Sequence, residues 1–295
     1  MEQRATIQRW IEQGGALEGA LGLFRAVKQE LPAVKNAGWV RNPIDQFILA
    51  KLEAQGLAPA PEANKRTLIR RLALDLTGLP PKPDEVQSFV EDSSANTYEK
   101  LVDKYLASAR WGEHRARYWL DAARYGDTHG IHIDNYREIW PYRDWVIQAF
   151  NANMPFDRFT TEQLAGDLLP NPTLEQLIAT GFQRCNVTTN EAGIIIDEYD
   201  AIYAKDRADT IGAVYLGLTV GCATCHDHKF DPIPLGTSTP WVRSSETQPR
   251  TSWTATSTIR RPSSSFRSPR TVRAGAKSEA GKRSWYSSSL IAARR

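Results

Sequence analysis

The sequence predicts a mainly α-helical protein, a multi-helix domain with little or no sheet. Apolar residues recur every three or four positions through most of the chain up to about residue 235. Residues that commonly begin or end helices stand at the edges of these periodic segments. The strict alternation of apolar and polar residues that marks half-buried strands is almost absent.

The first two helices have clear boundary signals. Asn42 and Pro43 are expected to open a helix that ends at Gly56, because proline suits the first helical position and glycine a helix end. The next helix is expected from Thr67 to Gly78. The residues predicted to face inward are Ile44, Phe47, Ile48 and Leu52 in the first helix and Leu68, Leu72 and Leu76 in the second.

Two more helices are expected after a loop that contains Pro80 and Pro81. Pro83 begins one of them, and Thr97 caps the other. The spacing of the apolar residues again predicts one buried face for each helix. The inward residues are Val86, Phe89 and Val90 in the former and Tyr98, Leu101, Val102 and Tyr105 in the latter.

Aromatic residues dominate the two helices that follow. One is expected over residues 111–125, with Tyr118 and Trp119 in the core. Pro141 is expected to open the other. The inward residues of this second helix are Trp145, Val146 and Phe150.

Short helices and one longer helix complete the predicted fold. Thr160 is expected to begin a short helix, with Gln163 as its capping-box partner. Thr173 is expected to begin another, with Gln176 in the same role. A longer helix over residues 198–218 then leads to a cysteine-containing motif.

Charge is unevenly distributed along the 295 residues, whose formal net charge is +3. Residues 236–295 contain ten Arg and two Lys against only Glu246 and Glu279. The preceding part is therefore net acidic, and we expect no nucleic-acid partner. No segment reaches the ~18 to 20 apolar residues of a membrane span. The first residues, MEQRATIQRWIEQGG, lack an apolar signal-peptide region, so no signal peptide is expected in this chain.

The basic tail over residues 236–295 is rich in Ser and shows no helical or strand-like period. One interpretation is an irregular, disordered appendage. The other, which we favour, is a frameshift caused by a single-base loss at about Gly236. Read one nucleotide earlier, the residues TSTPWVRSSETQ (237–248) can become DFYAMGAFFGDT, an apolar and aromatic segment of helical character.

The motif CATCH contains Cys222, Cys225 and His226. The two cysteines are three positions apart, so both thiols project from one face of a helical turn. This arrangement suits the two vinyl groups on one edge of a haem, and His226 can serve as the proximal iron ligand. The spacing favours haem c attachment and a role in electron transfer.

Other interpretations of the motif remain open. The pair could form a disulfide or a redox dithiol, or belong to a single non-haem metal site. In the last case the protein would be a metal-dependent enzyme acting on extracellular carbohydrate. The candidate metal ligands are His226, His228, Asp231, His129 and His132.

The histidines also bear on the haem interpretation. His129, His132, His228 or Met154 would be the sixth iron ligand, and an open sixth position would allow small-molecule chemistry. His129 and His132 could instead be loop histidines that cap backbone groups. Cys185 is expected to be a buried, apolar residue.

Several segments between about residues 40 and 235 form a distinctive set. They include NPIDQFILAKLEAQGLAPAPEA, LIRRLALDLTGLPP, RYWLDAARYGDTHGIHIDN and LGLTVGCATCHDHKFDPI. Together they resemble the planctomycete-type cytochrome c domain family, a bacterial family of largely unknown function. The resemblance implies an exported protein in which this domain lies between a smaller cytochrome domain and a further C-terminal domain.

The resemblance and the composition together predict four regions. Residues 1–20 are interpreted as the remnant of an upstream cytochrome c-like domain and residues 21–41 as a linker. Residues 42–235 form the helical domain, and residues 236–295 form the irregular tail. The expected partners are an unidentified electron donor or acceptor and the flanking domains of the full-length protein.

Overall fold

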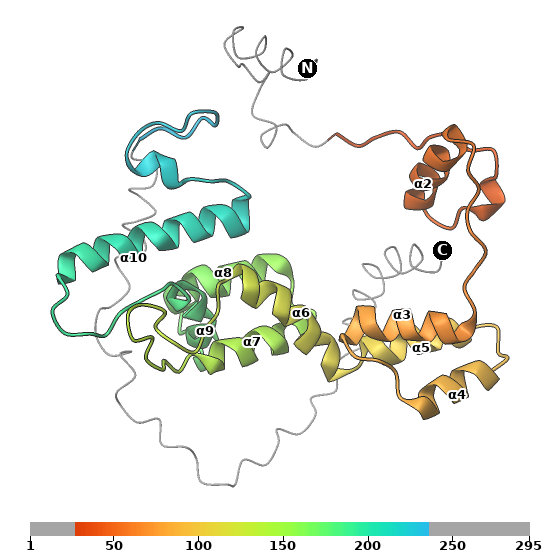
Figure 1. Cartoon of the computed structure of the whole chain (residues 1–295), viewed down its shortest axis with the longest axis horizontal. Helices are drawn as coiled ribbons and strands as arrows, with labels where there is room; N and C mark the ends of the chain where they lie inside the picture. The colour runs from red at the N-terminus through yellow and green to blue at the C-terminus, as the bar shows by residue number, and fades with distance from the viewer. Residues whose placement is uncertain (1–26, 236–295) are drawn as a thin grey trace, which may run out of the picture. The chain divides into compact units, whose positions relative to one another are not determined.

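Helices form nearly all of the regular structure in the computed structural model, which describes residues 27–235 (Figure 1). This described part of the chain contains no strand and only isolated bridges between loops. The predicted mainly α fold is therefore confirmed. The regions predicted over residues 1–20 and 236–295 lie outside the described residues.

The helices have the following bounds. The α-helices are α2 (Pro43–Ala54), α3 (Lys65–Thr77), α4 (Pro83–Glu91), α5 (Thr97–Leu106), α6 (Ala109–Ala122), α7 (Trp140–Asn151), α8 (Phe156–Ala165), α9 (Leu174–Ala179) and α10 (Ile196–Ile211). A π-helical turn, η5 (Gly212–Leu216), follows α10. Between residues 27 and 235 there are also four short 3-10 helices: η2 (Ala37–Trp39), η3 (Gly166–Leu168), η4 (Thr180–Arg184) and η6 (Gly221–Thr224).

Several helix boundaries follow from capping residues that the sequence identified. The Asn42 side chain accepts backbone N–H groups at the start of α2, and Thr173 forms a capping box with Gln176 at the start of α9. Gly78 ends α3 with φ +70°, a left-handed conformation that suits glycine. Helix α3 begins before Thr67, the residue predicted to start it. A side chain at the end of the preceding loop accepts the Thr67 N–H and caps the helix.

The chain divides into two compact units, which we describe separately. The helical unit comprises residues 29–128 and 136–185, and it contains α2 to α9. The described part of the motif unit comprises residues 27–28, 129–135 and 186–235, with α10 and the CATCH motif.

Helices α3, α4, α5 and α6 of the helical unit share one hydrophobic core. The predicted inward residues of α3 are buried, and Leu76 is completely inaccessible. Phe89 of α4 and Leu101 and Tyr105 of α5 meet them. The periodic apolar spacing therefore predicted this core correctly.

A second layer joins α6, α7 and α8 of the helical unit through aromatic rings. Trp145 stacks on Phe159 with a centroid distance of 5.4 Å, and Trp119 meets the same ring edge-on at 4.8 Å. The amide oxygen of buried Gln163 accepts hydrogen bonds from the Trp119 indole at 2.8 Å and the Tyr142 hydroxyl at 2.6 Å. This shared acceptor satisfies polar groups inside the aromatic layer.

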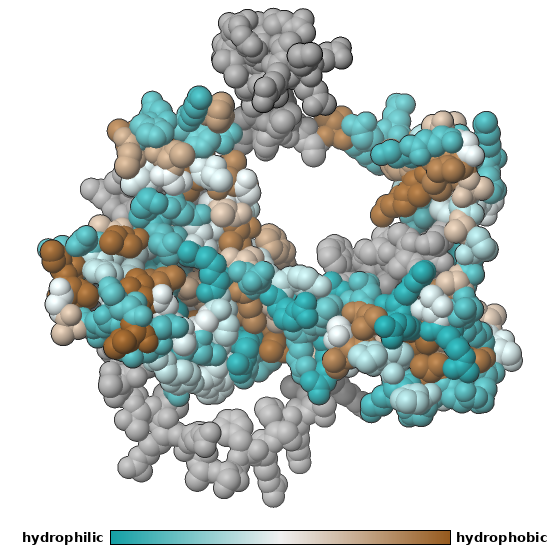
Figure 2. All heavy atoms as spheres, viewed as in Figure 1, coloured by the Kyte–Doolittle hydropathy of each residue, from teal (hydrophilic) through white to brown (hydrophobic). Residues whose placement is uncertain are grey.

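The predicted inward face of α2 is wrong. Ile44, Phe47 and Ile48 are 45%, 43% and 38% exposed, and a brown hydrophobic patch lies over α2 in Figure 2. Leu49 and Asp45 are buried instead. The carboxylates of Asp45 and Glu53, on this side of α2, accept backbone N–H groups of the preceding loop, so the loop runs along this side of the helix.

Two further expectations are corrected. Tyr118 is 56% exposed rather than part of the core, while its neighbour Trp119 is partly buried. Thr160 does not begin a helix, because α8 starts directly after Pro155 and includes Thr160 in its middle. Proline lacks an N–H group and readily precedes a first helical turn, so it sets this boundary.

None of the helices in the described residues combines the length and the apolar character that crossing a membrane requires.

Candidate functional site

Helix α10 leads the motif unit to the CATCH motif, much as the sequence predicts (Figure 1). The helix passes into the π-helical turn η5, and Gly217 reverses the chain with φ +64°. A short loop then enters η6, which contains Cys222. Rare π-helical turns often occur at functional sites, and five residues separate this one from Cys222.

The two cysteines occupy one helical turn, as predicted. The N–H groups of Cys225 and His226 both lie 3.2 Å from the Cys222 carbonyl oxygen, to which they donate. Residues three apart in a 3-10 helix lie on the same side of it. Cys222 and Cys225 are exposed free thiols and form no disulfide. The pair is thus accessible from solvent along one face.

His226 presents one unoccupied ring nitrogen. Its Nδ1 lies 2.7 Å from the backbone carbonyl oxygen of Asp227. A carbonyl oxygen can only accept a hydrogen bond, so this contact places the proton on Nδ1 and leaves the Nε2 lone pair available. A backbone carbonyl commonly orients a metal-binding histidine in this way.

His228 has the opposite arrangement. The backbone N–H of Asp231 donates to its Nδ1 at 2.8 Å, and its Nε2 lies 3.5 Å from the Thr219 hydroxyl. A neutral ring that accepts at Nδ1 carries its proton on Nε2, so neither nitrogen is available to a metal. Its side chain is only 8% exposed. We interpret His228 as a residue that holds the loop together.

His129 and His132 hold a second loop of the motif unit. The His129 Nδ1 lies 2.8 Å from the Thr188 hydroxyl, and the His129 carbonyl accepts the Thr188 N–H. His132, with φ +56°, places its Nδ1 3.3 Å from a Glu191 carboxylate oxygen. Both histidines therefore lie in a loop that contacts residues 188–191, and these ring contacts go to side chains rather than to the backbone groups expected of capping histidines.

The single non-haem metal site, with candidate ligands from both histidine-containing loops, receives no support. Across residues 27–235, no group of three or more His, Cys, Asp or Glu side chains is arranged to hold a metal ion. His228 and Asp231 do approach each other, with 3.3 Å between Nδ1 and a carboxylate oxygen. This pair alone supplies fewer ligands than protein metal sites normally require.

Two residues of α10 that the sequence interpretation missed support the CATCH turn. Lys205 and Asp209 form an ion pair at 2.5 Å, one helical turn apart. A Cβ at Gly221 would lie 3.2 Å from both Asp209 carboxylate oxygens, so this carboxylate packs against the start of η6. The four-residue spacing of Lys205 and Asp209 is the sequence pattern that could have predicted this ion pair.

The third cysteine and the candidate Met154 belong to the helical unit. Burial raises the pKa of Cys185 to about 12, and its thiol donates to the Gly181 carbonyl at 3.4 Å. Cys185 is therefore an inert, buried thiol, as predicted.

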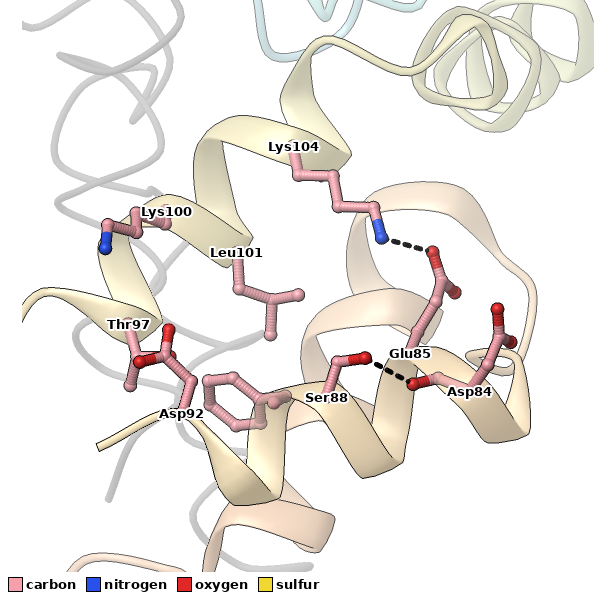
Figure 3. Close-up of a pocket in the computed structure, with 9 residues that line it drawn as sticks. Asp84, Glu85, Ser88, Asp92, Thr97, Lys100, Leu101 and Lys104 are labelled. Atoms are coloured by element: carbon pink, nitrogen blue, oxygen red, sulfur yellow. Dashed lines mark hydrogen bonds and ion pairs between the residues drawn. The ribbon is translucent and has the colours of Figure 1, made fainter. Parts of the chain in front are cut away.

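A shallow cavity of about 260 Å³ lies between α4 and α5 of the helical unit (Figure 3). Its polar residues interact with one another: Lys104 pairs with Glu85 at 2.7 Å, and the Ser88 hydroxyl donates to the Asp84 carbonyl at 2.9 Å. Phe89 and Leu101 belong to the core beneath. We assign no ligand to this cavity.

Comparison with protein families identifies the chain. Residues 43–237, more than half of the chain, match PSCyt2, described as a protein of unknown function (DUF1549). The chain belongs to the PSCyt2 family. This confirms the resemblance at the level of the family, whose description names no cofactor or reaction. No curated protein and no solved structure matched the chain.

Proposed function

We propose that the CATCH turn is a covalent attachment site for haem c and that this PSCyt2 domain takes part in electron transfer. Cys222 and Cys225 would form the two thioether bonds, and His226 would be the proximal iron ligand. The observation that carries the proposal is the free Nε2 of His226 beside two exposed thiols.

The residues present suit this cofactor in three respects. Cys222 and Cys225 lie on one side of a short helical turn, and both are reachable from solvent. His226 follows directly, with its ring oriented by the Asp227 carbonyl. Haem c would supply reversible one-electron transfer at its iron.

The hydrogen bonds divide the two histidines of the CHDH sequence by role. His226 is the ligand candidate, because only its Nδ1 is engaged by the neighbouring backbone. His228 holds the loop through the Asp231 amide and is a poor ligand candidate. We therefore do not assign His228 as the sixth ligand, and we leave His129, His132 and Met154 unassigned.

The chemistry of attachment also indicates where the protein works. Thioether formation requires reduced thiols and a haem-ligation system, which bacteria operate outside the cytoplasm. We infer that the full-length protein is exported. Its partner would be an electron donor or acceptor that approaches the exposed side of the CATCH turn.

The test is covalent haem staining and pyridine-haemochrome absorption of the full-length protein, expressed in the periplasm with haem-ligation proteins. The proposal expects one covalent haem, which should be lost in a variant with both Cys222→Ser and Cys225→Ser. Cys185→Ser is the matched control and should retain the haem, because Cys185 is buried away from solvent.

The histidines provide a second, finer test. His226→Ala should keep the covalent attachment but alter the Soret absorption, because the iron loses its proximal ligand. His228→Ala should retain the absorption spectrum. A folded, correctly exported protein without covalent haem would refute the proposal, and metal analysis would then test the non-haem alternative.

A further inference from the structure

Helices α3 and α6 of the helical unit carry exposed arginine side chains around one exposed tyrosine. Arg70 and Arg71 are exposed on α3, on the side away from its buried core residues. Arg117 and Tyr118 are exposed on α6, where Tyr118 is 56% exposed. The two helices pack against each other, because Trp111 of α6 belongs to the core that α3 helps to form. Residues of both helices can therefore contribute to a single surface.

A series of direct contacts joins the two helices at this surface. The guanidinium carbons of Arg115 and Arg117 lie 5.8 Å and 5.6 Å from the centre of the Tyr118 ring. Arg115 also donates to the Asp75 carbonyl oxygen, and the Asp75 carboxylate lies 4.0 Å from the same guanidinium. Asp75 lies one helical turn after Arg71 on α3. The surface is therefore continuous from Arg117 of α6 to Arg71 of α3.

We call this group of residues the arginine surface: Arg70, Arg71, Arg115, Arg117 and Tyr118. Its charge is only partly neutralised within the helical unit. Arg115 pairs with Asp75, but no ion pair among residues 27–235 involves the other three arginines. A guanidinium is weakly hydrated and can bind a carboxylate through two parallel hydrogen bonds. The arginine surface therefore suits a partner that supplies carboxylates.

The neighbouring side chains favour a protein partner over a polymer of phosphates. Leu74, one helical turn after Arg70, is 38% exposed and adds apolar area to the arginine surface. Tyrosine and arginine are enriched among the residues that contribute most to protein–protein binding. The side chains of Asp75 and Glu113, 52% and 44% exposed, stand among the arginines. These carboxylates would repel a continuous row of phosphates, whereas a folded partner can place its own carboxylates between them.

We propose that the arginine surface binds a partner protein with an acidic face. Carboxylates of the partner pair with the arginines, and an apolar group of the partner packs on Tyr118 and Leu74. The surface belongs to the helical unit, and binding there does not depend on haem attachment at the CATCH turn.

Nitration of Tyr118 by tetranitromethane, quantified by peptide mass spectrometry, reports on this surface directly. A short poly-L-glutamate peptide is the probe for an acidic partner, and it should slow Tyr118 nitration in the full chain by about threefold or more. The readout must be local, because residues 236–295 are rich in Arg and also attract acidic peptides. Tyr136, 65% exposed and outside both helices, is the internal control, and its nitration should not change. The protection should disappear at about 0.5 M salt, which screens exposed charges.

Charge-reversed variants locate the binding. The double variant with Arg70→Glu and Arg71→Glu should abolish the protection. The matched control has Arg41→Glu and Lys51→Glu, an equal change of net charge at exposed positions outside α3 and α6, and it should retain the protection. Arg117→Glu is an independent variant on α6 and should weaken the protection. Circular dichroism establishes that each variant is folded.

Three results would overturn the proposal. The first is the absence of protection in the parent chain, and the second is an equal loss of protection in both double variants. The third is protection of Tyr118 by single-stranded oligothymidylate that equals or exceeds protection by poly-L-glutamate, because that result would indicate a nucleic-acid partner instead. Covalent haem staining is unaffected by all three, so this proposal and the proposed function fail independently.

Discussion

The helical unit and the motif unit differ in how they are held together. The helical unit buries long apolar side chains from four consecutive helices in one core and adds a layer of stacked aromatic rings. Around the CATCH turn, a small apolar cluster and a set of loop hydrogen bonds stabilise the motif unit. Apolar burial contributes roughly 25 cal/mol per Å², so the helical unit should be the more stable of the two.

The difference between the two units determines where reactive side chains can be exposed. A loop held by hydrogen bonds leaves thiols and an imidazole accessible, whereas a packed core buries them, as it does Cys185. Segments with few buried apolar contacts open more readily than cores. Among the described residues, the exposed cysteines therefore lie in the unit with the smaller apolar cluster.

The largest effect is expected from Leu76→Ala in the helical unit. Leu76 is completely buried, so removing its side chain should cost about 2–5 kcal/mol of unfolding free energy. Urea denaturation followed by circular dichroism measures this loss. The matched change Val220→Ala, beneath the CATCH turn, should leave the main transition nearly unchanged. Equal losses from both variants would contradict the comparison.

A smaller loss is expected from Gln163→Ala. The variant removes the oxygen that accepts from both Trp119 and Tyr142, and an unmet buried donor typically costs about 1–3 kcal/mol. Urea denaturation monitored by tryptophan fluorescence should show a lower midpoint. Gln183→Ala, at another buried glutamine of the unit, is the control for loss of side-chain volume.

A local effect is expected from His228→Ala in the motif unit. Loss of the Nδ1 acceptor frees the Asp231 amide and should weaken the loop by about 1 kcal/mol. Hydrogen exchange over residues 227–235 should accelerate several-fold, while the main unfolding transition stays unchanged. The exposed His226→Ala is the control and should leave exchange at Asp231 unaltered. A shift in the main transition would contradict the expected local effect.

The smallest effect concerns pH. Burial, aided by Arg115 and Arg117, lowers the pKa of His114 below its ordinary value of 6.5. The unfolded chain therefore takes up the proton first as pH falls. Stability should be complete above about pH 6.5 and should decline as pH drops toward the lowered pKa of the folded state.

His114→Gln tests this expectation in the helical unit. Denaturation midpoints measured from pH 7.5 to pH 5 should fall less steeply in the variant than in the parent chain. A steeper slope in His114→Gln would contradict the assignment.

Much of the helical unit could be predicted from local patterns. Apolar spacing identified the core faces of α3, α4 and α5, and the caps at Asn42 and Thr173 fixed two helix starts. Apolar spacing and helix caps depend only on residues close together in the chain, so the sequence alone is enough to predict them. The side of α2 that faces inward was predicted wrongly, because the preceding loop binds to the side that carries Asp45.

The functional site was only partly predictable. The spacing of Cys222 and Cys225 placed both on one turn, as the structure has them. The roles of His226 and His228 were not separable, because they differ in burial and in the partners of their ring nitrogens, which only the folded chain shows. The contribution of Asp209 depends on its packing against Gly221, which lies twelve positions away in the chain.

The sequence by itself determined the helical class, most helix boundaries and the spacing of the cysteines, because these follow from backbone geometry and residues close in the chain. The tertiary structure alone decided which ring nitrogen of each histidine is engaged and which apolar side chains remain exposed. A tautomer depends on the hydrogen-bond partner brought near the ring, and exposure depends on what packs against a side chain. Both depend on how the chain folds back on itself.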